Sequence, residues 1–213
     1  MDYFLNSDGK KILTRMIDAI QRNKDYLSEI DGRVGDGDHG INMNKGFSIF
    51  EERIHDRDVT FSDGLGELGE ILLTEIGGSM GPIYGTIFGG MAERCGGAEE
   101  ISLSLFAEML RQGFEDLSEI IEAKVGDKTI VDTLAPAVES VERSVTIREP
   151  IGRAMASMIS AAERGKESTK EMVAKVGRSS RLGERSKGVL DAGAVSCFLI
   201  IEAMGQGIQE LCL

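Results

Sequence analysis

Three aspartates stand close together in the segment DGRVGDGDHG. Asp31, Asp36 and Asp38 fall within eight residues and are interleaved with glycines. Carboxylates this close repel one another unless a cation joins them, and carboxylate oxygens suit a hard ion such as Mg²⁺ or Ca²⁺. An EF-hand is excluded, because no Glu stands at the twelfth position counted from any of the three. The segment predicts a magnesium site shared with substrate phosphates, and a solvated acidic turn is the alternative interpretation.

Three further segments combine glycine with Ser, Thr, Asp or Lys, and each one precedes a helix-spaced apolar stretch. They are GGSMG (77–81), VGDKT (125–129) and the longer GERSKGVLDAG (183–193). Glycine lets backbone N–H groups approach an anion, and a helix that begins there adds the positive end of its dipole. Taken alone, each segment is also explained as a turn or a helix cap, with Asp127, Thr129 or Asp191 as the capping residue.

The elements that would position these segments are helices. Apolar residues at helical spacing run through nearly the whole chain, and no strand pattern of useful length competes. They mark eight helices, at about 12–20, 43–54, 65–76, 83–91, 103–121, 130–141, 151–162 and 195–211. If neighbouring helices run antiparallel, all odd-numbered connections lie at one end, and the four polar segments are those connections. The sequence therefore predicts an all-α fold with these loops together at one end; a further short helix at 24–30 or 168–176 would disturb the alternation.

Composition limits the possible classes of function. The chain has 213 residues, of which 41% are hydrophobic and 28% charged, and its net charge is −12. This is typical of a globular protein, and a single domain over 1–213 is expected. The negative charge argues against nucleic acid as a partner, because a phosphate backbone is bound by Lys and Arg clusters. Neither a bilayer-spanning run nor a signal peptide is recognisable, so a cytoplasmic protein without membrane contact is expected.

Cysteine and histidine contribute little to the expected chemistry. The three cysteines are widely spaced and fit neither a disulfide framework nor a metal site. Cys197 lies in an apolar run and is expected to pack as a small hydrophobic residue. With two histidines in the chain, a His-based metal site is not indicated. No nucleophile–histidine set can be argued, so no catalytic residue is identified in this chain.

Four segments together resemble the family of dihydroxyacetone kinase L subunits. They are GDGDHGINMNKGF, GGSMGPIYGT, GDKTIVDTLAPA and LGERSKGVLDAGAVS, in the same order and over essentially the whole chain. The resemblance implies an eight-helix antiparallel barrel with the nucleotide at one end. It also implies that Asp31, Asp36 and Asp38 hold two Mg²⁺ ions on the phosphates of ADP or ATP. The implied nucleotide contacts are His39, Gly40, Ile41, Asn42, Gly78, Ser79, Met80, Gly126, Thr129, Arg178, Asp191, Ala192 and Gly193.

The resemblance implies partners as well. In the family, dihydroxyacetone sits on a separate K subunit, and L subunits of this length resemble the bacterial form that depends on the phosphotransferase system. There ADP stays bound, and an M subunit rephosphorylates it. The chain is thus expected to be active only with its partner subunits. Two alternatives remain: a nucleotide-binding regulatory module that docks a transcription regulator, and a kinase subunit for a related ketose.

Overall fold

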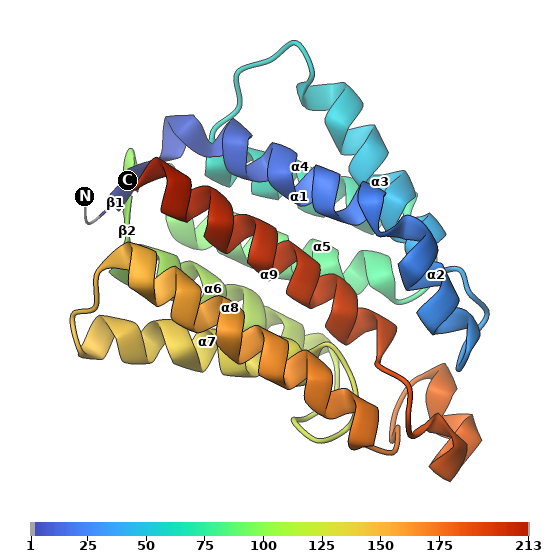
Figure 1. Cartoon of the computed structure of the whole chain (residues 1–213). Helices are drawn as coiled ribbons and strands as arrows, with labels where there is room; N and C mark the ends of the chain where they lie inside the picture. Colours follow the sequence, from blue (N-terminus) through green and yellow to red (C-terminus); the bar gives the residue numbers. More distant parts are fainter. Residues whose placement is uncertain (1–2, 213) are drawn as a thin grey trace.

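The computed structural model describes residues 3–212, which form nine α-helices and a two-stranded ribbon (Figure 1). The helices are α1 (Gly9–Arg22), α2 (Lys24–Gly32), α3 (His39–Ile54), α4 (Phe61–Glu75), α5 (Met80–Cys95), α6 (Leu103–Ile120), α7 (Val131–Thr146), α8 (Ile151–Ser168) and α9 (Ala192–Leu211). The short elements are β1 (Tyr3–Leu5), β2 (Glu100–Ser102) and the 3-10 helices η1 (Asn6–Asp8), η2 (Thr169–Glu171) and η3 (Arg178–Ser186). Strands β1 and β2 pair with each other in antiparallel register. The expected all-α class is confirmed.

Eight of the helices form a closed ring. Contacts run from α1 to α3 and from α3 to α4, then in chain order through α5, α6, α7, α8 and α9, and from α9 back to α1. Figure 1 shows ring neighbours running in opposite directions. These eight helices correspond to the eight marked by apolar spacing, so the expected antiparallel barrel is confirmed.

Helix α2 is an addition to the eight expected helices. The break that separates it from α1 falls at Asn23, whose side chain donates a hydrogen bond to the carbonyl oxygen of Ala19 at 2.8 Å. Such back-bonding by Asn competes with the helical ladder. Helix α2 continues toward the same end of the molecule as α1 and does not double back (Figure 1). The alternation of the connections is therefore kept, and Leu27 and Ile30 of α2 are buried.

Large apolar side chains fill the interior of the ring. Phe47, Phe50, Phe61, Phe88 and Phe106 are all almost completely buried. Each large side chain of this kind contributes roughly 1.5–3 kcal/mol when it leaves water. The helices are thus held chiefly by their inward faces.

Helix α9 closes the ring between α8 and α1 and is largely buried. Within residues 3–212, it alone is long and apolar enough to cross a membrane, but 72% of its apolar window is buried inside the protein. That burial is what a core helix shows. Cys197 on α9 is a buried free thiol, which confirms its expected packing role.

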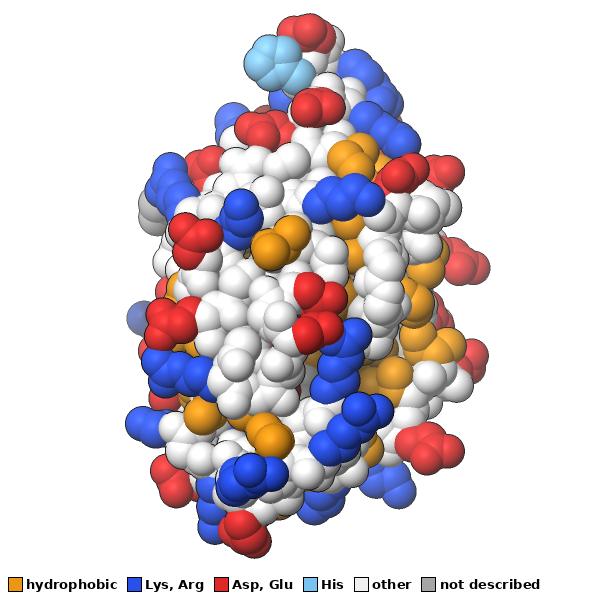
Figure 2. Space-filling model, turned by 90° about the vertical axis from the view of Figure 1, so that its right-hand side faces the viewer, with side chains coloured by type: hydrophobic (Ala, Val, Ile, Leu, Met, Phe, Trp, Pro, Cys, Tyr) orange, Lys and Arg blue, Asp and Glu red, His pale blue; other side chains and the backbone are white. Residues whose placement is uncertain are grey.

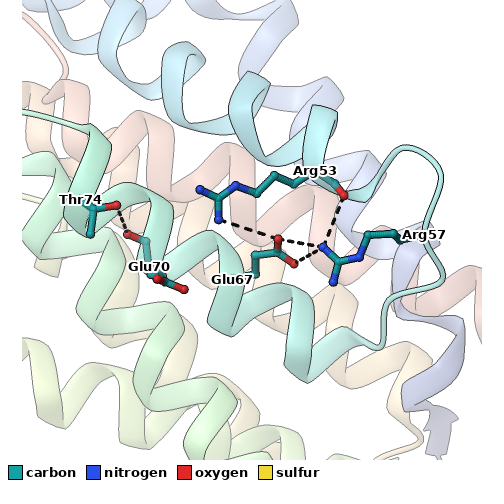
Figure 3. A network of polar contacts seen from close by, with 5 residues as sticks. All are labelled: Arg53, Arg57, Glu67, Glu70 and Thr74. Carbon is teal, nitrogen blue, oxygen red and sulfur yellow. Dashed lines mark hydrogen bonds and ion pairs between the residues drawn. The ribbon is translucent and has the colours of Figure 1, made fainter.

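Ion pairs connect α3 to α4 on the outside of the barrel (Figure 3). Glu67 of α4 pairs with Arg57 at 3.0 Å and with Arg53 at 4.0 Å. The two arginines are largely exposed, and ion pairs near the surface typically contribute less than about 1 kcal/mol. The buried face of α3, with Met43 and Phe47, accounts for most of its attachment.

A buried amide organises the end of the barrel that lies opposite the four polar loops. The side chain of Asn6 donates to Ser62 Oγ and to the carbonyl oxygen of Ala98, both at 2.9 Å, and accepts from the N–H of Ser62 at 3.0 Å. At the same end, the thiol of Cys212 donates to the carbonyl oxygen of Tyr3 at 3.6 Å. The first and last described segments therefore meet far from the polar loops (Figure 1).

We expect Asn6→Ala to lower the free energy of unfolding by about 2–3 kcal/mol, because it leaves a buried N–H and a buried carbonyl without partners. Urea denaturation measures the change. Asn23→Ala is the matched control: it removes one local hydrogen bond and should cost about 1 kcal/mol or less. Equal losses in the two variants would contradict the role given to Asn6.

Candidate functional site

A cavity of about 500 Å³ lies at the end of the barrel where the four polar loops meet. Its walls come from residues 31–39, the start of α5, the loop between α6 and α7, and the long connection between α8 and α9. The predicted convergence of these segments is confirmed. Figure 2 views this end face and shows acidic and basic side chains next to one another, with hydrophobic side chains exposed between them.

Three carboxylates meet on one side of the cavity. Asp31 lies in the last turn of α2, Asp36 in the following loop, and Asp38 at the N-cap of α3. One oxygen of each lies within 4.8 Å of an oxygen of the other two. Asp31 accepts from the N–H groups of Gly37 at 2.8 Å and His39 at 3.4 Å. Asp38 makes no side-chain capping bond, so its carboxylate is available to a cation.

Two glycines allow this loop to form. Gly37 has φ = 79°, a left-handed conformation that costs glycine little. Gly40 lies against α2, where a Cβ atom would stand 1.9 Å from the carbonyl oxygen of Lys24. The close approach of α2 and α3 brings Asp31 beside Asp38. Gly40 is therefore a packing position and is not part of the cavity wall.

The imidazole of His39 ties three helices together beneath the carboxylates. Its Nε2 lies 2.8 Å from Ser196 Oγ on α9, and Ser196 Oγ lies 2.6 Å from the hydroxyl of Tyr84 on α5. Burial lowers the pKa of His39 to about 4, against the opposing charge of Asp31. The ring is consequently neutral at neutral pH, and it offers an anion no positive charge.

Three helix N-termini face the cavity, those of α3, α5 and α9. Their unpaired N–H groups and dipoles favour a bound anion. At α5 the N-cap residue is Ser79, whose hydroxyl makes no capping bond. At α9 the N-cap residue is Asp191, whose carboxylate accepts from the N–H of Ala194 at 2.8 Å. Burial raises the pKa of Asp191 to about 6.

At the start of α7, the carboxylate of Asp132 binds N–H groups of the preceding loop. Asp132 accepts from the N–H of Gly126 at 2.5 Å and from the N–H of Thr129 at 2.8 Å. Helix α7 has Ile130 at its N-cap position, and the hydroxyl of Thr129 accepts from the N–H of Val131 at 3.2 Å. Thr129 therefore contributes a capping bond, whereas Asp127 does not cap this helix. Asp127 instead pairs with Lys175 at 2.9 Å, which joins this loop to the α8–α9 connection.

The α8–α9 connection reaches across the cavity to the carboxylates. Arg178, at the start of η3, forms an ion pair with Asp36. Both side chains are about half exposed, at 58% and 50%. Among residues 3–212, Arg178 is the one Lys or Arg paired with any of the three clustered aspartates. The cluster therefore keeps an excess of negative charge, which a divalent cation would balance.

Most of the residues predicted for the site line the cavity. They are Asp31, Asp36, Asp38, His39, Gly78, Ser79, Met80, Thr129, Arg178, Asp191, Ala192 and Gly193. Four others lie outside its wall: Gly40 packs against α2, Gly126 bonds to Asp132, and Ile41 and Asn42 follow on the first turn of α3. Ile41 is 55% exposed.

Two residues of the site, Tyr84 and Ser196, were missed by the sequence reasoning, whereas Lys128 lies in the segment 125–129 that it singled out. Tyr84 and Ser196 meet from positions 112 residues apart, and no local pattern marks such a contact. Lys128 lines the cavity and is 1% exposed. It stands within VGDKT, and the presence of a lysine in so short a glycine turn was the available signal.

Comparisons with known proteins give a consistent result. The model of the DAK2 domain family matches residues 33–206. The chain is 36% identical to the PEP-dependent dihydroxyacetone kinase, ADP-binding subunit DhaL, of Escherichia coli strain K12, over 93% of this chain and 95% of that protein. It is 31% identical to the PTS-dependent dihydroxyacetone kinase, ADP-binding subunit DhaL, of Lactococcus lactis subsp. lactis strain IL1403, over 90% and 92%.

A solved structure supports the fold. The crystal structure of the dihydroxyacetone kinase from C. freundii in complex with AMP-PNP and Mg²⁺ matches with a TM-score of 0.68 at 21% identity. The match covers 92% of this chain and 33% of that chain. At this identity the likeness concerns the arrangement of helices.

We expect Asp191→Asn to change the free energy of unfolding of the ligand-free protein more favourably at pH 7 than at pH 4.5, each compared with the wild type at the same pH. The folded-state pKa of about 6 lies above the ordinary 3.8, so the native state binds more protons between these values. Stability is lost as pH rises through that window, by about 3 kcal/mol at most. Asn keeps the cap but does not ionise. Denaturation of both proteins at the two pH values checks this, and a stability difference that does not change with pH would contradict it.

Proposed function

The chain belongs to the DAK2 domain family, and we propose that it is the ADP-binding subunit of a dihydroxyacetone kinase that depends on the phosphotransferase system. One observation carries the proposal: a carboxylate cluster and three helix N-termini face the same cavity. A cation site beside an anion site is what a magnesium–nucleotide complex requires. The names of the relatives, which are ADP-binding subunits, support the choice of nucleotide.

We place magnesium at Asp31, Asp36 and Asp38. The donors are all carboxylate oxygens, the ligands that a hard divalent ion prefers. The Gly37 N–H holds the Asp31 carboxylate in place, and Asp38 has no competing cap. Two ions are proposed on the family resemblance, and when bound they neutralise phosphate charge during transfer.

The nucleotide phosphates would lie between the cluster and the N-termini of α5 and α9. Ser79 offers a free hydroxyl, and Arg178 can turn from Asp36 to a phosphate oxygen, because an Arg side chain forms strong bonds to either anion. The apolar part of the wall, which includes Ile121 and Ile130, is suited to the base. The work of this chain is then positioning and charge neutralisation, without a covalent intermediate.

A second subunit is needed to complete the reaction, because the acceptor hydroxyl must lie in line with the transferred phosphoryl group. We propose that a K-type subunit carrying dihydroxyacetone docks on the loop end, and that an M-type subunit rephosphorylates ADP at the same face. The exposed Ile41 lies in the first turn of α3, at this end of the barrel. Residues 170–188 add six of the chain's 24 Lys and Arg and only two of its 36 Asp and Glu. We further propose a cytoplasmic location.

Asp36→Asn and Asp38→Asn are each expected to lower phosphoryl transfer at least about 100-fold, because one fewer carboxylate weakens the hold on magnesium. Helical circular dichroism should stay unchanged. Mass spectrometry of the denatured proteins should find ADP in the wild type and little in the variants. Asp127→Asn is the control, since Asp127 pairs with Lys175 outside the cavity wall. Full turnover in both cluster variants would place the metal elsewhere.

The docking proposal predicts that the isolated chain phosphorylates no dihydroxyacetone and that activity needs the partner subunits. Ile41→Arg should weaken K-subunit binding about tenfold or more, measured by calorimetry. Ile147→Arg is the matched control: Ile147 is 64% exposed but lies between α7 and α8, at the opposite end. Ser180→Glu, in η3, should also weaken docking. Equal effects at the two ends would refute the proposed docking face.

A further inference from the structure

The connection between α8 and α9 leaves the barrel after Thr169 and returns at Val189, two residues that lie close together. Between them it also contacts the barrel through the Lys175–Asp127 and Arg178–Asp36 ion pairs. Residues 170–188, here called the flap, contain η3 and Arg178. Two hydrogen bonds close its neck: the Gly188 N–H donates to the Lys170 carbonyl oxygen at 2.8 Å, and the Asp191 N–H donates to Thr169 Oγ1 at 3.1 Å. Inside the flap, Ser186 Oγ accepts from the N–H of Ala174 at 2.9 Å. The flap is therefore a loop with its own internal contact and a narrow base.

The ammonium group of Lys128 lies at this base. Its Nζ donates to the carbonyl oxygen of Thr169 at 2.6 Å and to that of Val189 at 2.5 Å. Thr169 comes immediately before the flap and Val189 immediately after it. One side chain, from the α6–α7 loop, thus holds both ends of the flap together.

The setting of Lys128 indicates that its side chain has a specific role. The residue is 1% exposed and has φ = 63°, a conformation that strains any residue with a Cβ atom and that glycine would adopt freely. Burial lowers the pKa of Lys128, while the charges of Asp191 and Asp132 act in the opposite direction. Backbone strain and burial both make lysine at this position lower the stability of the fold. The two hydrogen bonds of its ammonium group are the interactions that offset this cost.

We propose that Lys128 is a positioning residue that clamps the neck of the flap and so holds Arg178 over the nucleotide cavity. The part that concerns nucleotide rests on the proposed function, whereas the clamp does not. Without the ammonium group, the carbonyls of Thr169 and Val189 lose their shared partner. The two hydrogen bonds of the neck are then left to hold the ends of the flap, which separate more readily. Arg178 then no longer stays beside Asp36, and bound ADP loses one wall of its site.

The clamp is tested with Lys128→Met, which keeps the length of the side chain and the backbone strain but removes the charge. Lys124→Met is the control, because it makes the same change at an exposed lysine of the same loop. Trypsin cleaves after Arg181 and Arg185 within the flap. In nucleotide-free protein we expect this cleavage to be at least tenfold faster in Lys128→Met than in the control, at a temperature well below both melting points. Equal cleavage rates would overturn the clamp.

The role in nucleotide binding is tested by the release of a fluorescent ADP analogue in the presence of Mg²⁺. Lys128→Met should release it at least tenfold faster than Lys124→Met does. If Lys128→Met is cleaved faster in the flap but releases the ADP analogue at the wild-type rate, the positioning role is overturned. Absence of binding in the wild type would instead refute the proposed function and leave the cleavage result in force. If Lys128→Met does not fold, Thr169→Val, which removes the acceptor for the Asp191 N–H, should shift cleavage and release in the same directions.

Discussion

Repulsion among Asp31, Asp36 and Asp38 is the constraint on which the rest of the site depends. Two unit charges about 4 Å apart interact by roughly 4 kcal/mol at an effective dielectric constant of 20, and less where water reaches them. The net charge of −12 adds to this cost. Helix N-termini and one arginine compensate part of it, and a divalent ion would compensate the remainder. The helix N-termini and the arginine that offset the repulsion also surround the cluster with positive charge. Together with the carboxylates, they form a site for an anion bound to a metal ion.

The barrel meets this constraint through its connectivity. Because ring neighbours run antiparallel, alternate loops share one end, and four segments far apart in the sequence line one cavity. The opposite end is organised by Asn6 and the β1–β2 ribbon. Stability and ligand chemistry thus have separate locations, and a change in the loops leaves the buried faces of the helices in place.

The parts of the structure with a local pattern could be predicted from the sequence. Apolar spacing indicated all eight ring helices, and their alternation indicated which loops meet. A further short helix at 24–30 was left open, and α2 lies there. Apolar spacing alone could not settle the break at Asn23, because Ile20, Leu27 and Ile30 continue the apolar series across it. The carboxylate cluster was visible because its members are close in sequence. The contacts of His39, Ser196 and Tyr84 join three helices, so they have no local signature. Lys128 lies in a segment that the sequence marks, but its burial depends on a flap that begins more than 40 residues later.

The meeting of Tyr3 and Cys212 at the end away from the cavity has a consequence for covalent attachment. The 20-residue helix α9 spans about 30 Å between the two ends of the barrel. A tether joined to either terminal segment must cover that length, about ten extended residues, before it reaches the mouth of the cavity. A ketone-binding domain fused there must bridge this distance by its linker together with its own diameter, and a linker matched to that span would raise its effective concentration at the rim. Fluorophores or affinity tags placed at these termini leave the rim accessible.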